Sequence, residues 1–151
     1  FMENVVNYAG ATIREHGAFY GASGGKGVSY ISARDIGDVA AQVLVEGERH
    51  AGQRYTLTGP EAITDDAIAS KLSTLLSKPV RYVDLEPEQF IAGAKDKGTP
   101  SWMAEAVGGL ERVKRAGFAA DVSPATEQLL GRAGEGIDSF LAREAPRLAR
   151  G

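Results

Sequence analysis

The first sixteen residues carry side chains at the three- and four-residue spacing of an amphipathic helix. The pattern predicts one helix ending near His16, because Gly17 supplies the left-handed conformation that commonly closes a helix. No capping residue precedes this helix, so we expect a chain truncated at its start; a natural domain start with a frayed first turn is the alternative. The face consists of Phe1, Val5, Tyr8, Ala9, Thr12 and Ile13.

Short runs typical of strands alternate with helical patterns as far as Asp84. Between these runs, Asp35 is the predicted N-cap of a helix that Gly47 ends, and Thr64 caps a helix that Pro79 cannot extend. This alternation is typical of an α/β fold. The runs predicted to be extended are residues 18–20, 28–32, 54–58 and 80–84.

Helical patterns dominate the rest of the chain. Residues 87–97 and 101–115 form two predicted helices, and Ser123-Pro124 starts a short third one that ends near Gly131. A last helix presents an apolar face to the core. The whole chain is therefore predicted to be α/β, with a mostly helical second half.

Composition is that of an ordinary globular protein, with 43% hydrophobic and 25% charged residues. The net charge of −3 argues against a nucleic-acid partner, which needs a clustered basic patch. The absence of cysteine excludes disulfides and thiolate catalysis and fits a cytoplasmic protein. No apolar run approaches the length of a membrane span, so we expect no membrane partner.

A glycine-rich segment, residues 21–27, has the spacing G-x-x-G-x-x-G. A dinucleotide site needs a strand before these glycines and a helix after them, because the helix N-terminus binds the pyrophosphate. Here a strand-like run follows the glycines, and Lys26 precedes Gly27 instead of Ser or Thr. We therefore interpret the segment as a flexible surface loop.

The sequence assigns no catalytic residue. No tyrosine has a lysine four positions later, as the Tyr-x-x-x-Lys pair of classical short-chain dehydrogenases requires; Tyr30 with Arg34 comes closest. The two histidines have no ligand spacing, so no metal site is expected. Trp102 opens a predicted helix, where it either packs in the core or lines a pocket.

The order and spacing of several segments together carry a resemblance that covers essentially the whole chain. They are Phe1-Met2-Glu3-Asn4, Gly17-Ala18-Phe19-Tyr20, Val28-Ser29-Tyr30-Ile31, Arg34-Asp35-Ile36, the run from Arg54 to Glu61, Arg81-Tyr82-Val83-Asp84 and the run from Gln128 to Arg132. The sequence resembles the NmrA-like atypical short-chain dehydrogenase/reductase family, including its type 2 NAD(P)H:quinone oxidoreductases.

The resemblance implies the C-terminal part of a Rossmann-type NAD(P)-binding fold with a mostly helical substrate lobe. Residues 1–60 would be the remnant of the NAD(P)-binding domain and residues 61–151 the smaller substrate-side lobe. The missing N-terminal half of the fold would be a partner of this chain and would hold the glycine-rich turn. The complete protein would bind NADP or NAD, and the isolated chain is expected to be inactive.

The resemblance also implies candidate site residues. Phe1 and Asn4 would lie at the cofactor, and Tyr20 and Trp102 would contact a small-molecule substrate. The chain departs from the family in its loop, where Gly25 stands instead of a common acidic residue. The implied function is NAD(P)H-dependent reduction of quinone-like or small carbonyl substrates by hydride transfer. A non-catalytic NAD(P)-binding redox sensor of the NmrA type is the alternative.

Overall fold

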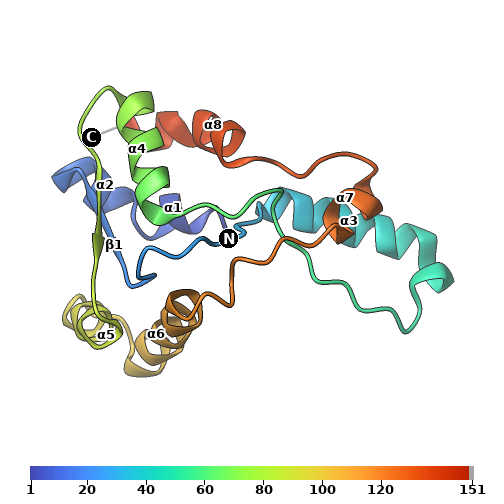
Figure 1. Ribbon diagram of the computed structural model, residues 1–151, viewed down its shortest axis with the longest axis horizontal. Coiled ribbons are helices and arrows are strands. Elements are labelled where there is room, and N and C mark those ends of the chain that lie inside the picture. The colour runs from blue at the N-terminus through green and yellow to red at the C-terminus, as the bar shows by residue number, and fades with distance from the viewer. Residues whose placement is uncertain (150–151) are drawn as a thin grey trace.

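A computed structural model describes residues 1–149 and contains a two-stranded parallel sheet surrounded by helices (Figure 1). Strand β1 (Ala18–Gly21) pairs with β2 (Arg81–Asp84), with Ala18 opposite Arg81 and Gly21 opposite Asp84. Because the strands are parallel, their carboxyl ends lie at one edge of the sheet. Figure 1 shows α5 (Pro87–Asp96) and α6 (Ser101–Arg115) at that edge.

The N-terminal segment forms two helices instead of the single predicted one. Helix α1 (Asn4–Asn7) and helix α2 (Gly10–His16) are separated by a break at Tyr8 and Ala9. Both helices contribute side chains to the core, since Val5, Val6 and Ile13 are all buried. Gly17 closes α2 with a φ of 59°, which confirms the predicted left-handed cap.

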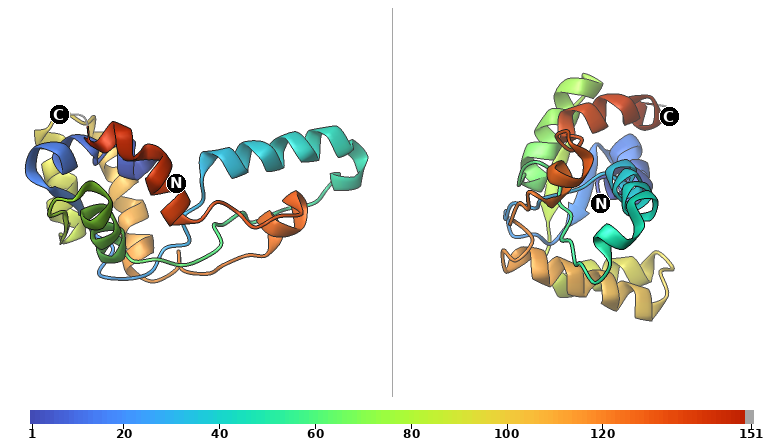
Figure 2. Two further views of the ribbon diagram at one scale, coloured as in Figure 1. Left: turned by 90° about the horizontal axis from the view of Figure 1, so that it is seen from above. Right: turned by 90° about the vertical axis from the view of Figure 1, so that its right-hand side faces the viewer.

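The prediction that Asp35 caps the next helix is wrong. Helix α3 (Ala33–Glu46) begins after Ser32, whose Oγ accepts a hydrogen bond from the Asp35 amide at 3.2 Å. Asp35 thus lies in the first turn of the helix, where a carboxylate is also favourable, and its side chain is fully buried. Figure 2 shows α3 and the 3-10 turn η1 (Gly47–His50) extending away from the sheet. The end of the predicted apolar stripe stays in solvent, because Leu44 is 81% exposed.

Two of the predicted strands are wrong. Within residues 28–32 only Val28 forms a bridge, antiparallel to Ile63, and residues 54–58 have no strand structure. Strand structure needs a neighbouring ladder, and none of the described residues supplies one to these two segments. Gly59, directly after the second segment, donates its amide to the Ser29 carbonyl at 3.3 Å.

Four of the remaining helices, α4 to α7, begin and end within about two residues of their predicted bounds, and α8 forms the predicted last helix. Thr64 is confirmed as a cap, since its Oγ1 accepts from the Ala67 amide at 3.2 Å. Helix α6 has its predicted bounds, and Gly131 ends α7 in a left-handed conformation. These elements are α4 (Asp65–Leu76), α5, α6, α7 (Ala125–Leu130) and α8 (Ile137–Ala149).

The core lies where α2, α4 and α8 meet around the sheet. Its fully buried members come from these helices and include Ile13, Ile68, Leu72, Phe140 and Leu148. The fold class is the predicted α/β class with a mostly helical C-terminal part. The division at residue 60 stays a prediction, and the sheet takes one strand from each side of it. Within residues 1–149, no helix is both long and apolar enough to cross a membrane.

Candidate functional site

The carboxyl edge of the sheet is the candidate site, because ligands of open α/β sheets bind outside the carboxyl ends of the strands. Strand β1 leads at this edge into the glycine-rich loop, and β2 leads into α5. The two strand ends are joined by a hydrogen bond from the Leu85 amide to the Gly21 carbonyl at 2.8 Å. Helix α6 supplies the side chains that close the edge.

The glycine-rich loop is bonded to the protein itself at this edge. Three consecutive amides at its start donate to side chains of β2 and α6, at 2.9 to 3.1 Å. An anion cradle needs its amides to point at the ligand, so this part of the loop does not serve as one. The interpretation of the segment as a flexible surface loop is wrong for its first residues, because Ala22 and Ser23 are fully buried. The pairs are Ala22 with Glu111, Ser23 with Tyr82, and Gly24 with Asp84.

A buried polar cluster lies beside this loop and joins three elements. The Tyr30 hydroxyl donates to Asp65 Oδ1, at the start of α4, at 2.7 Å. Lys114 of α6 places its Nζ 5.6 Å from the centroid of the Tyr30 ring and donates to Glu111 Oε1 at 2.6 Å. The cluster therefore fixes α6 against α4 and the 28–32 segment, with a single ammonium group at the centre.

The two tyrosines at the site hold their protons strongly. Burial raises the pKa of Tyr30 far above its ordinary value, and the neighbouring Asp65 carboxylate adds to the rise. Burial also raises the pKa of Tyr82, against the effect of its hydrogen bonds with Ser23. Neither phenol is therefore an easily ionised acid in the folded chain.

These raised pKa values predict a loss of stability in alkali. Both tyrosines stay protonated in the folded state, whereas the unfolded state releases their protons near the ordinary value of 10.0. Stability is thus complete below pH about 10 and falls as the pH rises further. A tyrosinate absorbance titration should show that two of the five tyrosines ionise only as the circular dichroism signal is lost. Ionisation of all five before unfolding would contradict the prediction.

The four residues predicted at the cofactor and the substrate lie in the N-terminal segment, in β1 and in α6. Phe1 is 63% exposed. Asn4 is exposed at the start of α1. The Tyr20 ring lies on β1 with the Nζ of Lys97 5.4 Å from its centroid.

Trp102 does not pack in the core, since it is 70% exposed in the first turn of α6. It lies at the N-terminal end of the helix, whereas Lys114 lies near the C-terminal end. No contact among the described residues joins these four side chains directly. Their roles remain predictions.

The sequence reasoning missed Glu111, Lys114 and Tyr82. One signal was present: Glu111 lies on the same helical face as Ala104 and Gly108, the face that α6 buries. A carboxylate on a buried face is rarely tolerated without a partner. Its partners, the Ala22 amide and Lys114, could be identified only from the folded chain.

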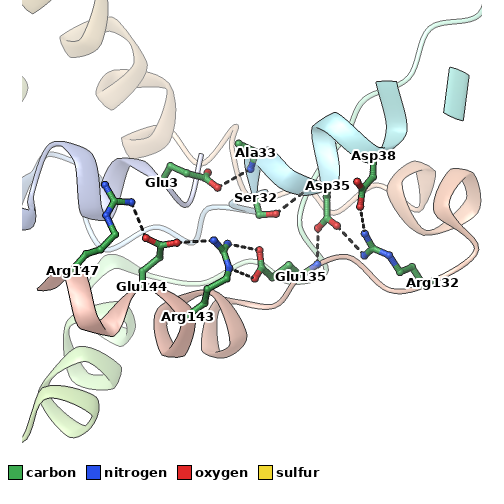
Figure 3. A network of polar contacts seen from close by, with 10 residues as sticks. All are labelled: Glu3, Ser32, Ala33, Asp35, Asp38, Arg132, Glu135, Arg143, Glu144 and Arg147. Atoms are coloured by element: carbon green, nitrogen blue, oxygen red, sulfur yellow. Dashed lines mark hydrogen bonds and ion pairs between the residues drawn. The ribbon is translucent and has the colours of Figure 1, made fainter. Parts of the chain in front are cut away.

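A second polar network holds the C-terminal segment to the start of α3 (Figure 3). The buried Asp35 carboxylate accepts from the Glu135 amide at 2.6 Å and pairs with Arg132 Nη1 at 2.9 Å. Arg132 also bonds Asp38 at 2.6 Å, and hydrogen bonds to the two carboxylates raise the pKa of this guanidinium. A cavity of about 380 Å³ adjoins these side chains and Arg34.

Further polar contacts join the start of α3 to α8 and to the N-terminal segment. Arg143 bridges Glu135 to Glu144 in Figure 3, and Glu144 also accepts from Arg147 at 2.8 Å. Separately, Glu3 Oε1 accepts from the Ala33 amide at 2.9 Å. The start of α3 is thus tied both to α8 and to Glu3, which directly precedes Asn4.

Known proteins with similar sequences are reductases. No family model matches the chain. The NAD(P)H azoreductase of Xenophilus azovorans is 36% identical over 145 residues, which is 96% of this chain and 50% of that protein. A "(4-alkanoyl-5-oxo-2,5-dihydrofuran-3-yl)methyl phosphate reductase" of Streptomyces griseus is 31% identical over 99% of this chain and 52% of its own length.

Solved structures show the same fold. The NADPH-dependent quinone oxidoreductase QOR2 of Escherichia coli has a TM-score of 0.86 and 26% identity, over 95% of this chain and 51% of that one. The Citrobacter triphenylmethane reductase complexed with NADP(H) has a TM-score of 0.82 at 23% identity, which shows the fold alone.

The chain spans about half the length of the relatives that it matches, and it does so with nearly all of its own residues. Its parallel strands and C-terminal helices are those of the C-terminal part of an NAD(P)-binding quinone reductase fold. The chain therefore matches the C-terminal half of the fold of these NAD(P)H-dependent reductases, in agreement with the resemblance to the NmrA-like atypical short-chain dehydrogenase/reductase family.

Proposed function

We propose that this chain forms the substrate side of an NAD(P)H-dependent reductase of quinone-like or small carbonyl compounds. The observation that carries the proposal is the 36% identity to an NAD(P)H azoreductase over 96% of the chain. The geometry supports it, because a cation and exposed apolar side chains of α6 lie at the carboxyl edge, where ligands of such sheets bind.

The residues of this chain suit one end of a dinucleotide. The bound cofactor would supply a hydride from its reduced nicotinamide. Phe1 and Asn4 are exposed and would contact that end of the cofactor. The first amides of the glycine-rich loop are already bonded to Glu111, Tyr82 and Asp84, so the pyrophosphate would have to bind elsewhere in the complete protein.

The proposal is tested with the complete protein that carries this chain. Oxidation of NADPH and NADH should be followed spectrophotometrically with menadione, an azo dye and a small aromatic aldehyde as acceptors. Turnover with at least one acceptor is expected. Tight dinucleotide binding without turnover on any acceptor would overturn the reductase proposal and favour the redox-sensing alternative.

Residues 1–151 alone are expected to bind NADPH poorly. Without a helix after the glycines, and with the loop amides occupied, the chain lacks the groups that normally hold a pyrophosphate. A fluorescence titration of NADPH with residues 1–151 should show no saturation at micromolar concentrations, whereas the complete protein should saturate. Micromolar binding by residues 1–151 would contradict the prediction.

A further inference from the structure

Helix α6 carries an apolar stripe that its packing leaves partly exposed. Met103, Val107 and Leu110 follow one another at spacings of four and three residues, and Lys114 comes four residues later. These spacings place the four side chains on one face of the helix. Met103 and Val107 are each 38% exposed and Leu110 is 62% exposed. We call these three residues the α6 stripe.

The face of α6 next to the stripe is the one that packs most closely against the protein. Ala104 and Gly108 are buried on that side. Gly108 crosses α5 so closely that a Cβ atom there would lie 2.3 Å from Ile91 Cγ1. The helix is therefore held by one face, and its orientation leaves the α6 stripe uncovered by α5.

Lys114 lies at the C-terminal end of the α6 stripe. Its ammonium lies over the Tyr30 ring, bonds Glu111 at 2.6 Å and has a side chain that is only 22% exposed. The α6 stripe thus runs toward the carboxyl edge of the sheet and ends there at a partly desolvated cation.

We propose that the α6 stripe binds the planar apolar part of the electron acceptor, with the reducible oxygen or nitrogen of the acceptor directed at Lys114. This inference rests on the proposed function, which supplies the acceptor. Charge complementarity selects the occupant: a narrow apolar face with a single ammonium at one end suits an aromatic carbonyl or azo compound, whose polar end gains negative charge on reduction.

The only tryptophan of the chain, Trp102, directly precedes the stripe and gives a binding signal that does not depend on turnover. Menadione should quench its fluorescence in the complete protein in a saturable way, as followed in a tryptophan-selective titration that uses a Trp102→Phe variant as the blank. Leu110→Ser should weaken this binding about tenfold, because a leucine contact contributes on the order of 1.4 kcal/mol or more. The matched control is Leu44→Ser, which removes a leucine that is 81% exposed on α3 and should leave binding unchanged.

The contribution of the cation is tested in the same titration. Lys114→Gln should weaken binding of menadione, whereas Arg112→Gln, two residues away on the same helix and paired with Glu88 in solvent, should not. Circular dichroism of each variant establishes that it is folded. If Lys114→Gln unfolds the protein, the comparison of Leu110→Ser with Leu44→Ser still decides.

The outcomes separate this inference from the proposed function. Equal binding by Leu110→Ser and Leu44→Ser would overturn the inference even if the protein reduces quinones. Saturable menadione binding that Leu110→Ser weakens, without any NADPH oxidation, would support binding at the α6 stripe and overturn the reductase proposal. Absence of saturable quenching, with Leu110→Ser altering the mass of the assembly in solution, would show that protein covers the stripe, and would also overturn the inference.

Discussion

Replacing Asp35 by alanine is expected to lower the free energy of unfolding by about 3 kcal/mol. The Asp35 carboxylate is fully buried and holds the Glu135 amide at 2.6 Å and the Arg132 guanidinium at 2.9 Å. Without it, the Glu135 N–H loses its partner in the interior of the network. The loop before α8 should then detach from the start of α3. Chemical denaturation followed by circular dichroism measures the change.

Asp38→Ala provides the matched control. Asp38 bonds the same guanidinium, at 2.6 Å, but its side chain is half exposed. Exposed ion pairs contribute about 0–1 kcal/mol, so this variant should remain close to the wild type. Equal losses of unfolding free energy for Asp35→Ala and Asp38→Ala would contradict the prediction. They would show that neither the burial of the Asp35 carboxylate nor its bond to the Glu135 amide adds to stability.

Gly59→Ala is expected to have an effect of similar size, for a steric reason. A Cβ atom at position 59 would lie 1.9 Å from the carbonyl oxygen of Tyr30. Backbone atoms cannot rotate out of the way as a flexible side chain can, so the 57–60 segment must move away from residues 29–31. We expect a loss of about 3 kcal/mol, at the upper end of the usual range for overpacking. The bond from the Gly59 amide to the Ser29 carbonyl should also be lost.

Gly37→Ala is the corresponding control. Gly37 lies in the interior of α3, and no atom outside its own helix would approach a Cβ atom there within 4 Å. Alanine is favoured over glycine in a helix by about 1 kcal/mol, so this substitution should stabilise the chain. Thermal unfolding of both variants measures the two shifts. A Tm for Gly59→Ala at or above that of the wild type would contradict the steric argument.

Asp35→Ala and Gly59→Ala both test how the candidate site is held in place. Tyr30, whose carbonyl Gly59 approaches, also donates to Asp65 and lies under Lys114. Asp35 fixes the start of α3, where the Ala33 amide also bonds Glu3. We therefore expect each variant to weaken binding at the carboxyl edge as well as the stability of the fold, although neither residue lies on the α6 stripe.

Sequence patterns predicted the helices well because capping and periodicity act over a few residues. Helix α6 has its predicted bounds, and Thr64 and Gly17 perform their predicted capping roles. The cap of α3 was misassigned to Asp35, because Ser32 and Asp35 both suit a helix start by residue type. Only the burial of the Asp35 side chain against Glu135 and Arg132 distinguishes the two positions.

The strands show the limit of local reasoning most clearly. Residues 18–20 and 80–84 were predicted from their composition, and they form β1 and β2 because each finds the other across the fold. Residues 28–32 have equally strand-like side chains, yet without a neighbouring ladder they form one bridge only. Strand structure depends on a partner that the local sequence does not specify.

The sequence by itself determined the α/β class, most helix bounds, the likeness to the NmrA-like family and the unsuitability of the glycine-rich loop for phosphate. The tertiary structure alone decided that Glu111 and Lys114 of α6 meet Ala22 and Tyr30 at the carboxyl edge, and that Trp102 stays exposed. The physical reason is distance along the chain. Helix signals act between close neighbours, whereas a site joins groups whose contacts exist only once the core has oriented the elements that carry them.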